Sequence, residues 1–139
     1  MYFHVWFVTK FRKPNLIGEI DIRIKSLFAE CIERHQYKVL EFETNVDHAH
    51  FVIEVGNRKE FSSAIRTIKA VSAREINKTL RRNHGGYCRR KPAEDKSFWA
   101  KRFGCRELSV SEVPAIREYV RDQKRHNKNT PRFRVGNGD

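Results

Sequence analysis

Apolar and polar positions follow regular periods through the first half of the chain, and these periods predict its elements. Residues 2–9 carry apolar side chains on both faces, which predicts a strand buried on both sides. Apolar residues recurring every three or four positions predict a helix over 19–36. Two alternating segments, 37–44 and 48–55, predict strands joined by a turn at 45–47.

The second half of the chain begins with a long predicted helix. Its apolar stripe runs from Phe61 to Leu80, and Ser62 is the expected N-cap. The next segment, 81–97, combines arginine and lysine with two adjacent glycines and a proline. This composition predicts a basic, mobile loop.

The C-terminal part of the chain is predicted to hold one more strand and one more helix. Residues 99–108 are expected to be extended, with an interruption at Gly104. The four residues 109–112, Ser-Val-Ser-Glu, match a capping box and predict the start of a helix. We expect this helix to end near His126 and to be followed by a polar, basic tail over 127–139.

The order strand, helix, strand, strand, helix, strand, helix predicts an α+β fold of the ferredoxin-like, or split βαβ, type. Such a fold has an antiparallel sheet with helices on one face, which leaves the other face free for a site. The last helix is an addition to this pattern. In the second strand, alternation places Val39 and Glu41 on one face and Leu40 and Phe42 on the other. The length of 139 residues predicts a single domain, 1–139.

A pair of histidines on the third predicted strand is the first candidate for chemistry. Alternation directs Ala49 and Phe51 into the core, so His48 and His50 point together onto the free face. Two imidazoles at positions i and i+2 can share one metal ion. The competing interpretation is a pair of half-exposed histidines on a solvated strand, since a three-residue motif recurs by chance.

The last predicted helix carries a second candidate group. Tyr119 and Gln123 are four residues apart and are expected on one side of the helix, one turn from each other. The competing interpretation is an amphipathic tyrosine packed at the edge of the apolar stripe, beside a solvated glutamine. Together with the histidines, however, the helix would supply a nucleophile and a third neutral ligand.

The net charge of the chain indicates the class of its binding partner. A net charge of +12 and a pI near 10.0 favour a polyanion, usually nucleic acid, over a merely soluble basic surface. No apolar run is long enough to cross a membrane, and the N-terminus lacks the features of a signal peptide, so we expect a cytoplasmic protein. Three cysteines without pair spacing are expected to be reduced.

Basic side chains on the predicted elements are candidates for phosphate contacts, although a solvated helix face is the alternative. These candidates are Lys10, Arg12, Lys13, Arg66, Lys69, Arg74, Lys78, Arg81 and Arg82. Trp99 and Phe103 could stack on unpaired bases, but burial as core aromatics is an equal expectation.

These motifs, taken in their order along the chain, resemble those of the single-tyrosine HUH transposases, the small IS200-like transposases of bacterial insertion sequences. The matching features are Asp-His-Ala-His on a strand, a basic helix, Phe98-Trp99, and a helix with Tyr-x-x-x-Gln. Residues 5–10 and 119–123 also fit, so the resemblance covers nearly the whole chain. One departure is Ala49, because the family usually has a bulky apolar residue between the histidines.

The resemblance implies a complete site and a reaction. His48, His50 and Gln123 would bind Mg²⁺ or Mn²⁺, and Tyr119 would cut single-stranded DNA through a 5′-phosphotyrosine, so that an insertion sequence is excised and inserted. It also implies hairpin DNA ends as partner and a homodimer, in which the tyrosine helix could serve either chain's histidines. Gly104 and Ser109, near the start of that helix, could permit such an exchange.

Three alternatives to an active transposase stay open from the sequence. The first is a non-catalytic module that binds single-stranded DNA or RNA on the same fold. The second is a structural zinc site formed by His84, Cys88 and Cys105, although their spacing fits no common zinc pattern. The third is a domesticated descendant that keeps the site but no longer moves an element. For the transposase, neutral histidines are required, so activity should fall as pH drops through roughly 6.5.

Overall fold

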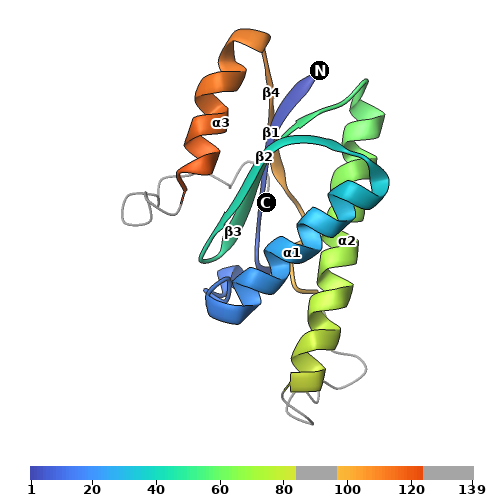
Figure 1. Ribbon diagram of the computed structural model, residues 1–139, viewed down its shortest axis with the longest axis vertical. Coiled ribbons are helices and arrows are strands. Elements are labelled where there is room, and N and C mark those ends of the chain that lie inside the picture. Colours follow the sequence, from blue (N-terminus) through green and yellow to red (C-terminus); the bar gives the residue numbers. More distant parts are fainter. Residues whose placement is uncertain (84–96, 124–139) are drawn as a thin grey trace.

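The computed structural model describes residues 1–83 and 97–123, and its centre is a four-stranded antiparallel sheet in the order β2-β3-β1-β4 (Figure 1). The strands are β1 (Tyr2–Val8), β2 (Lys38–Asn45), β3 (His48–Glu54) and β4 (Gly104–Leu108). A helix follows β1 and another follows β3, before the chain returns to the sheet. This topology confirms the predicted ferredoxin-like fold.

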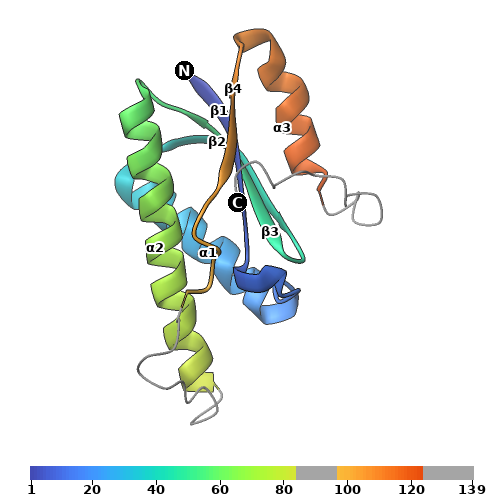
Figure 2. The ribbon, with the colours of Figure 1, turned by 180° about the vertical axis from the view of Figure 1, so that it is seen from behind.

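Helices lie on both faces of the sheet (Figures 1 and 2). Two long helices, α1 (Gly18–His35) and α2 (Arg58–Asn83), pack against each other on one face. The short helix α3 (Val113–Arg121) lies across the other face, against β2 and β3. Within residues 1–83 and 97–123, no helix is both long enough and apolar enough to cross a bilayer.

The main core lies between the sheet and the two long helices, as the alternation of β1 and β3 predicts. The two strands contribute Phe3, Val5, Phe7, Ala49, Phe51 and Ile53 to it. Trp99 joins this core, with its ring edge-on to Phe7 at 4.7 Å between centroids. Its Nε1 donates a hydrogen bond to Ser72 Oγ at 2.9 Å. Trp99 is therefore a core residue and does not offer its ring to a base, while Phe103 packs half-buried at the edge.

A second, smaller apolar cluster holds α3 on the opposite face. Its buried members are Val52, Leu108, Val113 and Val120. The prediction that this face of the sheet stays free is therefore wrong. The physical reason is that the apolar stripe of α3 must be covered, and Val52 offers an apolar surface among the polar residues of that face.

A β-bulge in β2 changes which of its side chains share a face. The pairing with β3 shifts by one residue between Val39 and Glu41. Leu40 consequently packs in the cluster under α3, whereas Phe42 packs in the main core. The prediction that Leu40 and Phe42 lie on one face is wrong, because the extra residue of a bulge reverses the alternation.

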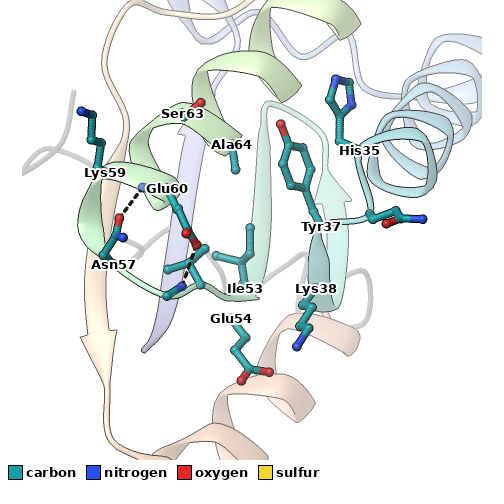
Figure 3. Close-up of a pocket in the computed structure, with 13 residues that line it drawn as sticks. His35, Tyr37, Lys38, Ile53, Glu54, Asn57, Lys59, Glu60, Ser63 and Ala64 are labelled. Carbon is teal, nitrogen blue, oxygen red and sulfur yellow. Dashed lines mark hydrogen bonds between the residues drawn. The ribbon is translucent and has the colours of Figure 1, made fainter.

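The start of α2 lies earlier than predicted. Asn57 Oδ1 accepts a hydrogen bond from the backbone N–H of Glu60 at 2.8 Å, which makes Asn57 the N-cap (Figure 3). Ser62 is therefore not the cap but lies within the helix. At its other end α2 continues to Asn83, into the segment predicted as a loop, and residues 84–96 lie outside the described residues.

The C-terminal elements are shorter than predicted. Of the segment 99–108, only Gly104–Leu108 forms a strand. The predicted capping box is present: the Ser109 N–H donates to Glu112 Oε1 at 2.8 Å, and this turn leads into α3. The helix ends at Arg121 instead of near His126, and the predicted tail lies outside the described residues.

Gly104 gives a test of the packing between β1 and β4. A methyl group at this position would overlap the ring of Trp6 on the neighbouring strand. We expect Gly104→Ala to lower the free energy of unfolding by about 1–3 kcal/mol, because an overpacked ring must leave its preferred position. Urea denaturation measures this change. Cys105→Ala, at an exposed position of the same strand, is the control and should leave the free energy of unfolding nearly unchanged. An unchanged midpoint for Gly104→Ala would contradict the close packing.

Candidate active site

The two predicted histidines lie at the start of β3, on the face that α3 covers. Their imidazole centroids are 4.8 Å apart, with the rings steeply inclined to each other. His48 is 5% exposed and His50 is fully buried. The interpretation of two half-exposed histidines on a solvated strand is therefore wrong, and the two rings belong to an enclosed polar cluster.

Asp47 orients the ring of His48. Asp47 Oδ1 lies 2.7 Å from His48 Nδ1, so in the neutral imidazole the proton resides on Nδ1 and the lone pair on Nε2. Arg12 Nε donates to the other carboxylate oxygen at 3.2 Å. Burial alone would raise the pKa of Asp47, but the hydrogen bonds from His48 and Arg12 outweigh it and hold that pKa below its ordinary value. The carboxylate is thus a stable acceptor for the His48 proton.

His4 of β1 is part of the same cluster and was not among the predicted site residues. His4 Nε2 lies 3.2 Å from His50 Nδ1, and the two rings are nearly parallel at 5.4 Å. Alternation along β1 directs His4 away from the core face that carries Phe3, Val5 and Phe7. The pairing of β1 with β3 then brings His4 to His50, a contact that was not predicted from the sequence.

Burial governs the protonation of these histidines. It lowers the pKa of His4 to about 4, with a further decrease from the positive charge of Arg106. Burial also lowers the pKa of His50 well below 6.5, and the charges of His48 and His4 act in the same direction. Burial therefore favours the neutral form of His50 below pH 6.5, and the expected fall of activity near pH 6.5 stays a prediction.

Helix α3 brings Tyr119 to the histidines within one chain. The phenol ring is edge-on to His50 at 6.0 Å and to His4 at 6.2 Å between centroids. The side chain is half-buried, so the site stays accessible from solvent on the tyrosine side. The structure thus places the nucleophile candidate beside the histidines of its own chain.

Gln123 follows the end of α3 and is fully buried. The prediction of one continuous helix through Tyr119 and Gln123 is wrong, yet the turn still directs Gln123 inward. Asn45 Nδ2 donates to the backbone carbonyl of Gln123 at 3.0 Å, and Asn45 is the residue that pairs with His48 across β2 and β3. The buried Gln123 Oε1 accepts no hydrogen bond from any described residue.

The donor set of the site suits a divalent cation. Among the described residues, no three His, Cys, Asp or Glu side chains are grouped to hold a metal, so a site here needs the glutamine as well. A buried amide oxygen without a hydrogen-bond donor matches the oxygen preference of Mg²⁺, and two imidazoles suit Mn²⁺. For the alternative zinc site, His84 and Cys88 lie outside the described residues, and Cys105 is exposed.

The predicted phosphate-binding residues divide between the two faces of the sheet. Lys10, Arg12 and Lys13 follow β1 and lie at the end of the sheet that holds the histidines. Exposed residues of α2 lie on the opposite face: Arg66, Arg74 and Lys78. The side chains of Arg81 and Arg82 lie outside the described set. The two groups therefore cannot form one continuous surface around the site.

Lys69, one of the predicted phosphate contacts, bonds the segment before β4. Its ammonium donates to the backbone carbonyls of Ala100, Lys101 and Arg102 at 2.8, 3.1 and 3.3 Å. It also lies over the ring of Phe7 at 5.5 Å, and burial lowers the pKa of Lys69 to about 8. This ammonium fixes the segment before β4 to α2.

A cavity of about 680 Å³, shown in Figure 3, has neither His48 nor His50 in its lining. It is lined from the end of α1, the start of β2, the end of β3 and the start of α2, including Tyr37, Glu54 and Lys59. Because β3 begins at His48, this cavity is at the opposite end of that strand. It contains none of the predicted site residues.

Comparisons with known proteins agree with the fold. The model of the family described as IS200-like transposases matches residues 1–123. A solved structure of a Deinococcus radiodurans R1 protein assigned as a transposase is similar with a TM-score of 0.64 and 17% identity, over 89% of this chain and 91% of that one. A REP-associated tyrosine transposase bound to a REP hairpin is similar with a TM-score of 0.55 and 15% identity, over 86% of this chain. This chain spans 62% of the REP-associated structure. No curated protein sequence matches this chain.

The buried histidines predict a loss of stability in acid. His4 has a lowered pKa in the folded chain, so between pH 6.5 and about 4 the unfolded chain binds more protons. Stability is complete above pH 6.5 and should fall by about 3 kcal/mol as pH decreases toward 4, from His4 alone. Urea denaturation in EDTA at each pH measures this loss. His4→Phe should flatten the dependence of the free energy of unfolding on pH, and His35→Gln should not. Equal slopes for the wild type and both variants would contradict a buried, neutral His4.

Proposed function

The chain belongs to the family of IS200-like transposases, and from this membership we propose that Tyr119 cuts and rejoins single-stranded DNA beside a cation held by His48, His50 and Gln123. The observation that carries the proposal is the position of the Tyr119 ring. Its centroid lies 6.0 Å from the centroid of the His50 ring in the same chain. A tyrosine at the edge of an apolar stripe would need no histidine cluster beside it. Here the phenol ring lies edge-on to the buried rings of His50 and His4.

The proposed reaction exchanges one phosphate ester for another. Tyr119 Oη forms a bond to the scissile phosphorus as the phenol loses its proton, and the bond from phosphorus to the 3′ oxygen breaks. The 3′ oxygen takes up a proton and leaves as a hydroxyl, while the 5′ phosphate stays on the tyrosine. A 3′-hydroxyl later attacks this ester and releases Tyr119. Each step conserves one phosphate ester bond, so no nucleotide cofactor is required.

The chain's own residues prepare the site for this exchange. Asp47 holds the proton on Nδ1 of His48, and the contact with His4 fixes the ring of His50. Asn45 holds the turn that contains Gln123. When bound, Mg²⁺ or Mn²⁺ supplies Lewis-acid stabilisation of the charge that develops on the phosphate oxygens. Fixed ligands of this kind need little rearrangement to accept the ion.

The substrate that we propose is single-stranded DNA with a hairpin, from the ends of the element that the transposase moves. The net charge of +12 and the basic residues beside the site support a polyanion, and one structural relative is bound to a REP hairpin. The expected homodimer stays a prediction. Because Tyr119 and His50 adjoin in one chain, we propose that each chain cuts with its own tyrosine.

Removal of one oxygen atom tests the nucleophile. Tyr119→Phe keeps the packed ring but should abolish the covalent protein–DNA adduct, because no hydroxyl is left to attack phosphorus. Labelled single-stranded DNA carrying the hairpin, incubated with Mn²⁺ and run on a denaturing gel, shows the adduct directly. Tyr37→Phe, at the remote cavity, should keep it.

Two outcomes of this assay would count against the proposal. Tight DNA binding without any adduct from the wild-type chain would favour the non-catalytic binding module. Adduct formation by a mixture of Tyr119→Phe and His48→Ala chains would contradict cleavage within one chain, since only exchanged helices could restore a complete site.

The metal ligands can be tested without DNA. Titration calorimetry with Mn²⁺ should show binding to the wild-type chain that weakens by about tenfold or more in His48→Ala and in Gln123→Ala, because each removes a ligand. His35→Ala, on the far side of the sheet, is the matched control. Unchanged affinity in Gln123→Ala would remove the glutamine from the proposed ligand set.

A further inference from the structure

The turn that follows β1 holds an exposed aromatic side chain beside the candidate active site. Phe11 is 79% exposed, more than any other large hydrophobic residue in the described part of the chain. It lies in a short 3-10 turn, Lys10–Arg12, and its basic neighbours in the chain are Lys10, Arg12 and Lys13. An isolated exposed phenylalanine needs no explanation by itself, so the inference depends on how the turn is built.

The backbone of this turn is strained in a way that projects the ring. Phe11 has φ 59° and Arg12 has φ 52°, a left-handed conformation that bulky residues rarely adopt. Hydrogen bonds hold it: Arg12 N–H donates to the Thr9 carbonyl at 2.8 Å, and Thr9 Oγ1 donates to the Lys13 carbonyl at 2.8 Å. Such conformations persist where the surrounding structure imposes them, often at functional sites.

The same turn is joined to the proposed ligand His48. The Thr9 N–H donates to the Asp47 carbonyl at 2.9 Å, and Arg12 Nε donates to Asp47 Oδ2 at 3.2 Å. Asp47 in turn contacts His48 Nδ1. Both views of the fold show the turn beside the tip of the β2–β3 hairpin (Figures 1 and 2). Phe11 is thus held at a constant position relative to the site.

We propose that Phe11 is a stacking platform for an unpaired base of the DNA strand, next to the phosphate that Tyr119 attacks. This inference rests on the proposed function. An aromatic ring among cations offers a base its face and the neighbouring phosphates their counter-charges, which is the combination that binds single strands without sequence preference. Lys10 Nζ lies over one face of the ring, 5.3 Å from its centroid, so a base would stack on the other face.

Stability and DNA affinity should change independently when the ring is removed. Phe11→Gly suits the left-handed backbone, so its urea midpoint should equal or exceed that of the wild type. Its affinity for fluorescein-labelled oligothymidylate, measured by anisotropy in EDTA, should be about tenfold weaker. Phe11→Trp should keep the affinity. Ile22→Ala, 69% exposed on α1, is the matched control and should change neither quantity.

An abasic oligonucleotide separates stacking from charge. The wild type should bind the abasic strand more weakly than oligothymidylate, and Phe11→Gly should reduce this difference, because the platform contacts bases only. The dependence of log affinity on log salt should be unchanged in Phe11→Gly and smaller by about 0.7 in Lys13→Ala.

Several results would overturn the inference. One is an unchanged DNA affinity in Phe11→Gly, and another is an equal loss of affinity for both oligonucleotides. A third is a change of oligomeric state in Phe11→Gly without a change of DNA affinity, which would assign Phe11 to contact with a second copy. Absence of binding to both oligonucleotides would also overturn the inference, whereas the adduct on the hairpin substrate tests the proposed function separately. Every chain in these measurements, including the reference chain with Phe11, carries Tyr119→Phe, so failure of cleavage does not affect them.

Discussion

The packing of α3 on the sheet is the interaction on which the site depends. Val113 and Val120 of the helix contact Val52 and Leu108 of the strands and form a cluster separate from the main core. This contact covers the histidines and brings in Tyr119, and the turn after the helix buries Gln123. Without it, the fold would be an ordinary ferredoxin-like sheet with one polar face in water. The apolar cluster and the polar site are therefore two parts of one interface.

Burial of several polar groups under α3 has an energetic consequence. Neutral imidazoles can be buried if their ring nitrogens have partners, and Asp47 and His4 provide such contacts for His48 and His50. A charged imidazole is disfavoured at His4 and at His50, because burial lowers the pKa of both side chains. Burial thus keeps the ring of His50 neutral, which is the form that the proposed metal binding requires. It also makes the same interface sensitive to acid.

The two faces of the sheet have different roles. The face under α1 and α2 carries the large aromatic core, which Trp99 completes and to which Lys69 fixes the segment before β4. The other face carries the proposed chemistry. The turn after β1 lies at the edge between them, joined to Asp47 by both backbone and side chain. A DNA strand that reaches Tyr119 from this edge would meet basic residues before it meets the site.

The local sequence by itself determined the elements and the faces of their side chains, because periodicity is a property of the backbone. It placed His48 and His50 together on one face and identified the capping box before α3. Only the tertiary structure decided the contacts across strands. The pairing of β1 with β3 brought His4 to His50, the bulge in β2 moved Leu40 under α3, and the turn after α3 buried Gln123. These depend on residues distant in the chain, whose registers and partners no local period encodes.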